Sequence, residues 1–459
     1  MARRIVVLGG GISGYGSAIL AKKEGFDTFL SDAGHIAERF RRRLDEWQVP
    51  YEEGGHTEEL ILSASEVVKS PGIPETAPIV QLIRRHGIPV ISEIEFAGRY
   101  LDGARTVCIT GSNGKTTTTS LIYKIMRDAG MNVALGGNIG ESFAYSVATG
   151  HYDWYVLELS SFQLDGMYKF RADVAVLMNI TPDHLDRYDH SFEKYAASKM
   201  RITQNQRSSD AFIYSADDEM TTRQMELLAD GMRQRRMPFA AHTAIASMAG
   251  DAFFDGGEFT ASVGGRSVMV DASKMRIKGL HNAYNAMAAS LAALAAGVEP
   301  EPIVRSIYDF SPVEHRLEPA GERDGIQYVN DSKATNVDSV WYALESMTRP
   351  TVWIAGGTDK GNDYEPLKAF AREKVKALVC MGVDNRKLVE SFTGVVPKVI
   401  STSSLDEAMR AAVAEARSGD TVLLSPACAS FDLFRNYENR GEEFKQWVKD
   451  NILGNGAKE

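Results

Sequence analysis

Cysteine is scarce in this chain of 459 residues, and its three cysteines stand far apart. Cys108, Cys380 and Cys428 show neither paired spacing nor a C-x-x-C motif. This spacing argues against a disulfide framework, a thiol redox motif and a cysteine zinc site. We therefore expect a protein of a reducing compartment, in which all three thiols are small buried apolar groups.

Long apolar runs and basic blocks are also missing. No stretch reaches the roughly 18 apolar residues of a membrane span, and the apolar run near the N-terminus is too short for a signal peptide. A net charge of -10 with no basic block argues against a general nucleic-acid binder. We expect a cytoplasmic monomer with no nucleic-acid partner and no membrane insertion.

Short apolar runs alternate with amphipathic segments along the chain, which is typical of parallel sheets with crossover helices. The chain is too long for one hydrophobic core, and the pattern restarts twice. We predict three α/β domains: a Rossmann-like domain (1–97), a central P-loop ATPase-like domain with a mainly parallel sheet (98–312) and a Rossmann-like C-terminal domain (313–459). Expected strands include residues 4–10, 28–33, 66–74, 89–96, 106–110, 154–161, 174–181, 326–332, 350–357, 377–383 and 421–427, and expected helices include 13–23, 117–130 and 277–298; residues 98–106 read as a linker.

A glycine motif, "GGGISG", occupies Gly9 to Gly14 between the first expected strand and helix. Its backbone N–H groups and the helix N-terminus can face an anion. Asp32 ends the second strand, at about the 20-residue offset of a ribose-binding acid. Two interpretations stay open: an NAD-dependent dehydrogenase, or a tight turn found in any doubly wound sheet.

A second glycine motif, "TGSNGKTTT" from Thr110, resembles a phosphate-binding loop that has lost one glycine, since Ile109 stands where G-x-x-x-x-G-K-[ST] requires it. Gly111 and Gly114 allow close backbone approach, Lys115 suits the β- and γ-phosphates, and the Thr116 hydroxyl suits Mg²⁺. The alternative, a glycine-rich helix cap, would not require the lysine.

Acidic residues follow two of the strands that the sequence predicts for the central domain. Glu158 ends one strand, at the position of a Mg²⁺ ligand in a P-loop protein. Asp183, His184 and Asp186 follow another. His184 or one of the acids can bind a metal, while capping or ion pairing by Asp183 and Asp186 is an equal alternative. Together with the loop, these residues indicate an ATP–Mg²⁺ site.

Longer blocks are similar to the Mur ligases, a family that includes folylpolyglutamate synthase. "TGSNGKTTT", "GGNIG" (from Gly136), "LELSSFQL", "NITPDHLDRY" and "YAASKMRI" resemble its central domain, whose loop is shortened in the same way. "HRLE" (from His315), "NDSKATN" (from Asn330) and "LLSPACASFDLFRNYENRGEEF" (from Leu423) resemble its D-glutamate-adding members. The resemblance implies an ATP-dependent ligase of peptidoglycan precursor synthesis, which joins D-glutamate to UDP-N-acetylmuramoyl-L-alanine through an acyl phosphate.

The resemblance also implies roles for individual residues. Catalytic roles fall on Lys115, Asn138, Glu158, His184 and Lys199. ATP contacts fall on Gly111, Ser112, Asn113, Gly114, Lys115, Thr116, Thr117, Asn282, Asn285, Arg316 and Asp331. The UDP-substrate contacts are Gly11, Ile12, Ser13, Asp32, Ser70, Gly72, Asn138 and His184, and the D-glutamate contacts are Lys333, Thr335, Lys360, Ser430 and Tyr437. Two Mg²⁺ ions are implied, held by Thr116, Glu158, His184 and Lys199, the last as a CO₂-derived carbamate.

Several of these roles have simpler alternatives. From the residues alone, Lys199 reads as a solvated helical lysine, Lys333 and Lys360 as surface lysines, and Tyr437 as a packing aromatic. Ala33 and Gly34 depart from the polar residues that relatives often place after the acid. The resemblance implies that the third domain closes over ATP. Other functions to exclude are a Mur-type ligase with another acceptor, a dehydrogenase, and a non-catalytic nucleotide-binding regulator.

Overall fold

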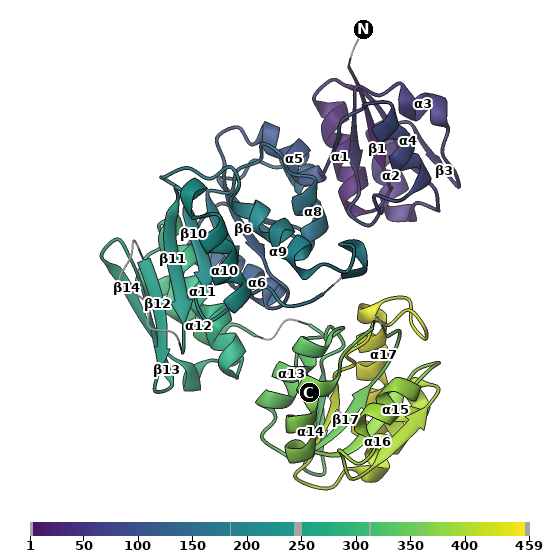
Figure 1. Cartoon of the computed structure of the whole chain (residues 1–459), viewed down its shortest axis with the longest axis vertical. Coiled ribbons are helices and arrows are strands. Elements are labelled where there is room, and N and C mark those ends of the chain that lie inside the picture. Colours follow the sequence, from purple (N-terminus) through teal and green to yellow (C-terminus); the bar gives the residue numbers. More distant parts are fainter. Residues whose placement is uncertain (1–2, 184, 243–249, 312–313, 360, 455–459) are drawn as a thin grey trace. The chain divides into compact units, whose positions relative to one another are not determined.

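The computed structural model of this chain contains three β-sheets, whose strands alternate with helices along the chain (Figure 1). It describes residues 3–183, 185–242, 250–311, 314–359 and 361–454. The chain divides into two compact units. One unit comprises Met1–Met275 and Asn282–Phe310 and holds the first two sheets, and the other comprises Arg276–His281 and Ser311–Glu459 and holds the third.

The first sheet is parallel throughout, in the order β3-β2-β1-β4-β5. Its strands are β1 (Arg4–Leu8), β2 (Asp27–Asp32), β3 (Tyr51–Glu53), β4 (Glu66–Lys69) and β5 (Val90–Ile91). The connecting helices are α1 (Ile12–Lys23), α2 (Glu38–Glu46), α3 (Glu58–Leu62) and α4 (Pro78–Arg85). The chain moves outward from β1 to β3 and then returns to β4, so the strand order reverses between β1 and β4. Ligands of such sheets bind where the order reverses, and the Gly9–Gly14 turn follows β1 there.

The central sheet has the order β14-β13-β12-β11-β10-β9-β6-β8-β7. It is parallel from β7 to β12, while β12, β13 and β14 pair antiparallel at one edge. Its strands are β6 (Arg105–Thr110), β7 (Val133–Gly137), β8 (Trp154–Glu158), β9 (Val174–Leu177), β10 (Ala211–Ser215), β11 (Arg235–Ala240), β12 (Gly250–Asp255), β13 (Glu258–Val263) and β14 (Arg266–Asp271). Its helices are α5 (Glu93–Ala97), α6 (Lys115–Asp128), α7 (Phe143–Thr149), α8 (Ser161–Asp165), α9 (Phe192–Met200), α10 (Glu219–Leu227), α11 (Leu280–Ala296) and α12 (Pro300–Asp309). Every residue of β8 and β9 is buried, as expected for strands that helices cover on both faces.

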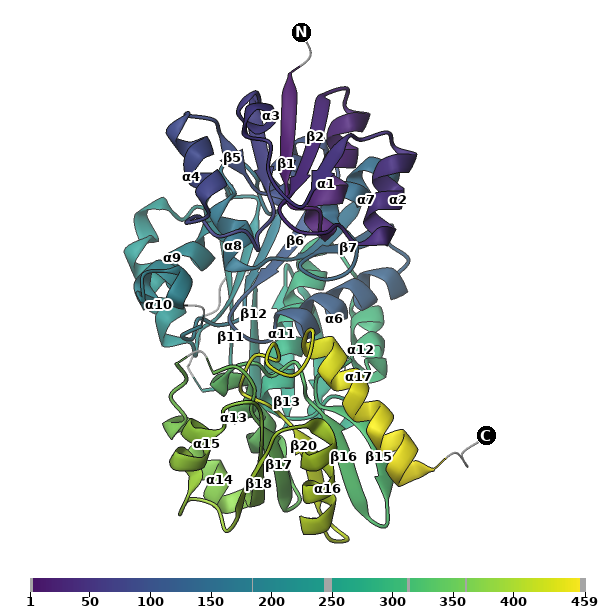
Figure 2. The same cartoon turned by 90° about the vertical axis from the view of Figure 1, so that its right-hand side faces the viewer.

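The third sheet has the order β15-β16-β20-β17-β18-β19, in which only the β15–β16 pair is antiparallel among the described strands. Its strands are β15 (Glu318–Arg323), β16 (Ile326–Asn330), β17 (Thr351–Ala355), β18 (Val375–Met381), β19 (Val399–Thr402) and β20 (Thr421–Leu424). The helices are α13 (Val337–Ser346), α14 (Lys368–Lys374), α15 (Arg386–Phe392), α16 (Leu405–Glu415) and α17 (Tyr437–Val448). Helix α17 packs on β15 and β16 (Figure 2).

The predicted α/β class with mainly parallel sheets is confirmed, but the strand expected at residues 89–96 is mostly wrong. Only Val90–Ile91 is a strand, and Glu93–Ala97 forms α5. Ser92 caps this helix by accepting a hydrogen bond from Glu95 N (3.3 Å). Both helix carboxylates are buried: Glu93 accepts from Ser142 Oγ (2.5 Å) and Ala144 N (3.0 Å), and Glu95 accepts from three consecutive backbone N–H groups, of residues 168–170. These long-range donors override the alternating apolar pattern of the segment.

Residues 98–106, expected as a linker, begin with a short 3-10 helix (Gly98–Tyr100) and end inside β6. The three domain boundaries stay predictions. None of the described helices combines the length and the apolar character needed to cross a membrane.

Candidate nucleotide and substrate site

The predicted phosphate-binding loop connects β6 of the central sheet to α6. Gly111 and Gly114 have φ angles of +152° and +81°, values that side chains rarely adopt. A Cβ on Gly114 would lie 2.6 Å from Asn285 Oδ1, and a Cβ on Gly111 would lie 2.9 Å from Met178 Cβ. The glycines are therefore required by backbone conformation and by close packing, independently of any ligand.

The end of β9 supports this loop from the adjacent strand. Ser112 N donates to Asn179 O (3.0 Å), and Asn113 N donates to Asn179 Oδ1 (2.8 Å). Ser112 Oγ donates to Thr181 O (2.8 Å) and lies 3.1 Å from Tyr195 Oη. These bonds orient the loop, and they give Asn179 a supporting role.

Two lysines meet at one carbonyl of the loop. Lys115 Nζ donates to Gly111 O (2.6 Å) and Ser112 O (2.8 Å), and Lys199 Nζ donates to Gly111 O (2.8 Å). Lys199 lies on α9, is 1% exposed, and its Nζ is 4.6 Å from the centroid of the Tyr195 ring. Burial, followed by the charge of Lys115, holds the pKa of Lys199 well below its ordinary value. The solvated helical lysine is thus excluded, and Lys199 is a buried amine at the phosphate-binding loop.

Glu158 lies at the carboxyl end of β8 and is 1% exposed. Its Oε1 accepts from Asn138 Nδ2 (2.9 Å), on the segment after β7. Its Oε2 is buried and has no hydrogen-bond partner among the residues that the structure describes. A buried carboxylate oxygen without a donor is costly unless a cation or a ligand meets it, so Glu158 fits a metal ligand.

The start of α11 completes the loop's surroundings. Asn285 Oδ1 accepts from Thr118 Oγ1 (3.1 Å), and Asn285 Nδ2 donates to Asn282 Oδ1 (3.0 Å). Both asparagines are buried, as are Thr116 and Thr117 in the first turn of α6. The structure therefore places Asn282 and Asn285 beside the loop although about 170 residues separate them in sequence.

The N-terminal glycine turn is held by Asp32, which ends β2. Its carboxylate accepts from Gly10 N (2.5 Å) and Gly34 N (2.7 Å). Ser70 Oγ donates to Gly9 O (3.4 Å), and a Cβ on Gly14 would lie 1.7 Å from that same carbonyl oxygen. Gly11 thus lies on the turn that follows β1, Ser70 and Gly72 lie on the turn that follows β4, and Ile12 and Ser13 are the first two residues of α1.

The N-terminal and central sheets are joined by partly buried polar contacts within their unit. Arg43 Nη1 pairs with Glu141 Oε2 (2.8 Å), and Tyr15 Oη donates to Glu141 Oε1. Arg43 also lies over the Tyr145 ring, 4.5 Å from its centroid. These residues join α1 and α2 to the segment that follows Asn138.

In the other unit, the segment after β16 carries several predicted residues. Asp331 is 1% exposed and accepts from Ser425 Oγ (2.8 Å) and Leu317 N (3.2 Å). Burial raises the pKa of Asp331 to about 6, against the opposing charge of Arg316. Lys333 Nζ lies 3.3 Å from Tyr437 Oη, which places two of the predicted D-glutamate residues together.

The remaining predicted residues are partly accounted for. Thr335 follows Lys333 in the same segment, with its N–H donating to Lys333 O (3.0 Å), and Ser430 is 2% exposed. His184 and Lys360 lie outside the described residues. In the described part of the chain, no group of three or more His, Cys, Asp or Glu side chains is arranged to bind a metal ion.

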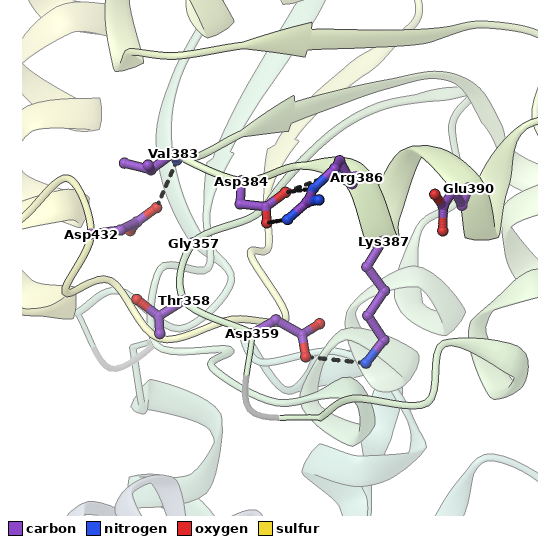
Figure 3. A pocket seen from close by; sticks show the side chains of 9 residues that line it. All are labelled: Gly357, Thr358, Asp359, Val383, Asp384, Arg386, Lys387, Glu390 and Asp432. Carbon is purple, nitrogen blue, oxygen red and sulfur yellow. Dashed lines mark hydrogen bonds and ion pairs between the residues drawn. The ribbon is translucent and has the colours of Figure 1, made fainter.

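A cavity of about 520 Å³ opens where β17 and β18 end (Figure 3). Its lining is mixed in charge: Gly357, Thr358, Asp359, Val383, Asp384, Arg386, Lys387, Glu390 and Asp432. Arg386 pairs with Asp384 (2.6 Å), and Lys387 pairs with Asp359 (3.2 Å). No pattern in the sequence predicted this cavity. In the sequence, the lining residue Asp359 directly precedes Lys360, and the lining residue Asp432 follows Ser430 by two positions.

Comparison with known proteins agrees with this geometry. Residues 4–78 match the MurD N-terminal domain, residues 109–293 the Mur ligase middle domain and residues 315–428 the Mur ligase glutamate ligase domain. Among solved structures, the UDP-N-acetylmuramate–alanine ligase of Thermotoga maritima has a TM-score of 0.61 at 18% identity, covering 98% of this chain and 99% of its own. A pseudomurein peptide ligase of Methanothermus fervidus has a TM-score of 0.60 at 21% identity, covering 92% of this chain and 96% of its own. These two likenesses show the fold.

Curated relatives are much more similar in sequence. The UDP-N-acetylmuramoylalanine–D-glutamate ligase of Bacteroides fragilis is 53% identical over 98% of this chain and 100% of its own length. The enzymes of the same description from Bacteroides thetaiotaomicron and Porphyromonas gingivalis are 51% and 49% identical, over 98% and 97% of this chain and 100% and 98% of their own lengths. The chain belongs to the Mur ligases, and within them to the family of UDP-N-acetylmuramoylalanine–D-glutamate ligases.

Proposed function

We propose that this chain uses ATP to join the amine of D-glutamate to the alanyl carboxylate of UDP-N-acetylmuramoyl-L-alanine. The observation that carries the proposal is the meeting of Lys115 and Lys199 at one carbonyl of the predicted phosphate-binding loop, beside the end of the paired strand that carries Glu158. It occurs in a chain about half identical, over nearly its whole length, to ligases of that description.

The chemistry requires activation of a carboxylate, which is a poor electrophile. An alanyl carboxylate oxygen attacks the γ-phosphorus of ATP, the bond to the bridging oxygen of ADP breaks, and an acyl phosphate forms. The amine of D-glutamate then attacks the carbonyl carbon, phosphate leaves with the C–O bonding electrons, and the amine loses a proton. Catalysis of such transfers depends on positioning and on neutralising charge.

Residues of the chain supply both. The N-terminus of α6, which follows the Gly111–Gly114 loop, would face the phosphates, and Lys115 would add a cation. Thr116 and Glu158 would hold Mg²⁺, and the orphaned Glu158 Oε2 supports that role. Magnesium, when bound, would neutralise phosphate oxygens. Asn138 fixes the Glu158 side chain from the next strand.

Lys199 is the proposed site of carbamate formation. Its neutral amine would attack CO₂: an N–C bond forms, one C–O π bond breaks, and the nitrogen loses a proton. The product is an anion beside Lys115, where protonated Lys199 would be a second cation. The contact with Gly111 O and the full burial of the amine support this role, since a charged Lys199 would repel both Lys115 and a metal ion. The proposed second Mg²⁺ would be bound by the carbamate and by His184.

A ¹³C NMR spectrum of protein equilibrated with ¹³C-bicarbonate tests the modification. We expect a carbamate resonance that disappears in Lys199→Arg. Lys194→Arg is the matched control, because Lys194 lies on the same helix, is 59% exposed and pairs with Asp189. Absence of the resonance from active wild-type protein would refute the carbamate.

We assign the three substrates to different parts of the chain. We assign the Gly9–Gly14 turn, Asp32 and Ser70 to the uridine diphosphate of the substrate. We assign Asn282, Asn285, Arg316 and Asp331 to the nucleotide of ATP, and Lys333, Thr335, Lys360, Ser430 and Tyr437 to D-glutamate. Closure of the C-terminal domain on ATP belongs to the same proposal, and small-angle scattering unchanged by nucleotide plus substrate would contradict it.

Phosphate release from ATP, with Mg²⁺ and UDP-N-acetylmuramoyl-L-alanine, tests the function directly. Parallel reactions contain D-glutamate, L-glutamate, L-alanine or diaminopimelate. Release that requires D-glutamate is expected, and its absence from Lys115→Ala would link it to this loop. Release with another amino acid would overturn the acceptor, and no release with any would overturn the reaction. We also propose a cytoplasmic monomer, for which light scattering should give a mass of 50.4 kDa.

A further inference from the structure

Arg440 is a fully buried guanidinium in the first turns of α17, with an exposed fraction of 0%. Each of its three nitrogens donates hydrogen bonds. Nε donates to Ser332 Oγ (2.9 Å), Nη2 donates to Ser332 O (2.8 Å) and Cys428 O (3.4 Å), and Nη1 donates to Cys428 O (3.3 Å) and Gly356 O (3.5 Å). The guanidinium of Arg440 thus donates hydrogen bonds to three separate segments of one unit.

These acceptors are unusual for a buried arginine. Four of the five bonds go to backbone carbonyls and one to a hydroxyl, and no carboxylate of the described residues forms an ion pair with Arg440. Burying a charge without an ion-pair partner costs free energy. In agreement, burial lowers the pKa of Arg440 to about 10. Because burying this charge costs free energy, we infer that the geometry of the Arg440 guanidinium has a specific role.

The three segments are those that carry the expected D-glutamate contacts. Ser332 directly precedes Lys333, Gly356 is the first residue after β17 and comes four positions before Lys360 in the sequence, and Cys428 lies two residues before Ser430. Ser332 Oγ also donates to Tyr437 O (2.8 Å), at the start of the helix that carries Arg440. The Gly356 and Cys428 segments are further paired by hydrogen bonds between Thr358 and Ala429.

We propose that Arg440 is a positioning residue for D-glutamate: its guanidinium holds the segments after β16, β17 and β20 in the arrangement that binds the amino acid. The inference rests on the proposed function. Arginine suits this task because a planar fork can reach several carbonyls at fixed angles, whereas the ammonium of lysine is a single point with three donors. A positive charge at position 440 is therefore insufficient to hold the three segments, and Arg440→Lys should lose this positioning role.

Steady-state kinetics of the full chain test this inference. We expect Arg440→Lys to raise the KM for D-glutamate at least about tenfold and to leave the KM values for ATP and UDP-N-acetylmuramoyl-L-alanine within about twofold, because only the amino-acid segments are displaced. Arg349→Lys is the control. Arg349 precedes the amino end of β17, and its Nη1 donates to Gly325 O (3.4 Å). Because this bond is at the opposite end of β17 from the Gly356 segment, we expect all three KM values to stay unchanged.

Two further variants separate positioning from folding. Ser332→Ala removes the hydroxyl that accepts from Nε and donates to Tyr437 O, but leaves the Arg440 guanidinium and its four bonds to carbonyls in place. It should raise the KM for D-glutamate several-fold without lowering the Tm by more than a few degrees. In Arg440→Ala, added methylguanidinium should restore a lower KM for D-glutamate, whereas methylammonium should not.

An unchanged KM for D-glutamate in Arg440→Lys, or a parallel rise for all three substrates, would overturn the inference. If neither Arg440 variant folds, Ser332→Ala decides by the same criterion. Failure of wild-type protein to release phosphate with D-glutamate would instead overturn the proposed function, so the two failures are distinguishable.

Discussion

Replacing Gly114 with alanine should damage both stability and nucleotide binding. Gly114 precedes α6 with φ +81°, and left-handed backbone costs an L-residue about 1–2 kcal/mol. The added Cβ would lie 2.6 Å from Asn285 Oδ1, so the asparagine must move. It would then weaken its bonds with Thr118 and Asn282, each a contribution of about 0.5–1.5 kcal/mol. Together these terms predict a loss of about 2–5 kcal/mol.

Gly130 offers a control on the same helix. It follows the C-terminus of α6 with φ +80°, but a Cβ there would meet nothing within 4 Å. Gly130→Ala therefore carries the backbone strain alone, about 1–2 kcal/mol. The difference between the two variants isolates the displacement of Asn285.

Calorimetry and binding of a non-hydrolysable ATP analogue provide the two measurements. At about 2–4 °C per kcal/mol, the Tm should fall by roughly 4–20 °C in Gly114→Ala and by roughly 2–8 °C in Gly130→Ala. Analogue affinity should fall at least about tenfold only in Gly114→Ala, because Asn285 leaves the loop. Equal Tm values for the two variants, or full analogue affinity in Gly114→Ala, would refute this reasoning.

Three other substitutions test the remaining parts of the site. Asp32→Ala leaves the N–H groups of Gly10 and Gly34 without their acceptor, so the KM for the UDP substrate should rise about tenfold with little change for ATP; an equal change for both would contradict a local role. Lys115→Met should lower kcat by about 10²–10³ while the Tm is maintained, and near-normal turnover would remove the lysine from phosphate binding. Burial raises the pKa of Asp331 to about 6, so the protonated form is favoured by folding and its stabilisation is lost as pH rises from about 4 to 6. Urea unfolding should show wild-type stability falling over this range by on the order of 3 kcal/mol relative to Asp331→Asn; parallel pH profiles would exclude this linkage.

The local parts of the site could be predicted from the sequence because they depend on short-range patterns. Glycines after an apolar strand required the turns at Gly9–Gly14 and Gly111–Gly114, and polar residues at strand ends identified Glu158. The burial of Lys199 could not be derived in this way. Its contact with Gly111 O joins residues 88 positions apart, and only the fold determines which side of α9 faces the loop.

The burial of Arg440 could not be predicted from the sequence either. Its sequence context, "NYENRGEEF", is strongly polar and predicts an exposed helix, yet its side chain is fully buried. The carbonyls that accept its hydrogen bonds lie in segments that begin at residues 332, 356 and 428, and no local pattern links them. Likewise, the helix at Glu93–Ala97 forms because distant N–H groups meet its carboxylates, which periodicity does not record.

The missing glycine of the phosphate-binding loop has a structural explanation in the pairing of β6 with β8. Ile109 is a fully buried residue of β6, and its register partner on β8 is Glu158. Where a standard loop would already have begun, this chain continues as strand to Thr110, and Leu159 N donates to Ile109 O (2.8 Å). The one residue that breaks the motif is therefore the residue that aligns Glu158 with the loop. A glycine at position 109 would restore the motif but would weaken the strand that sets this alignment.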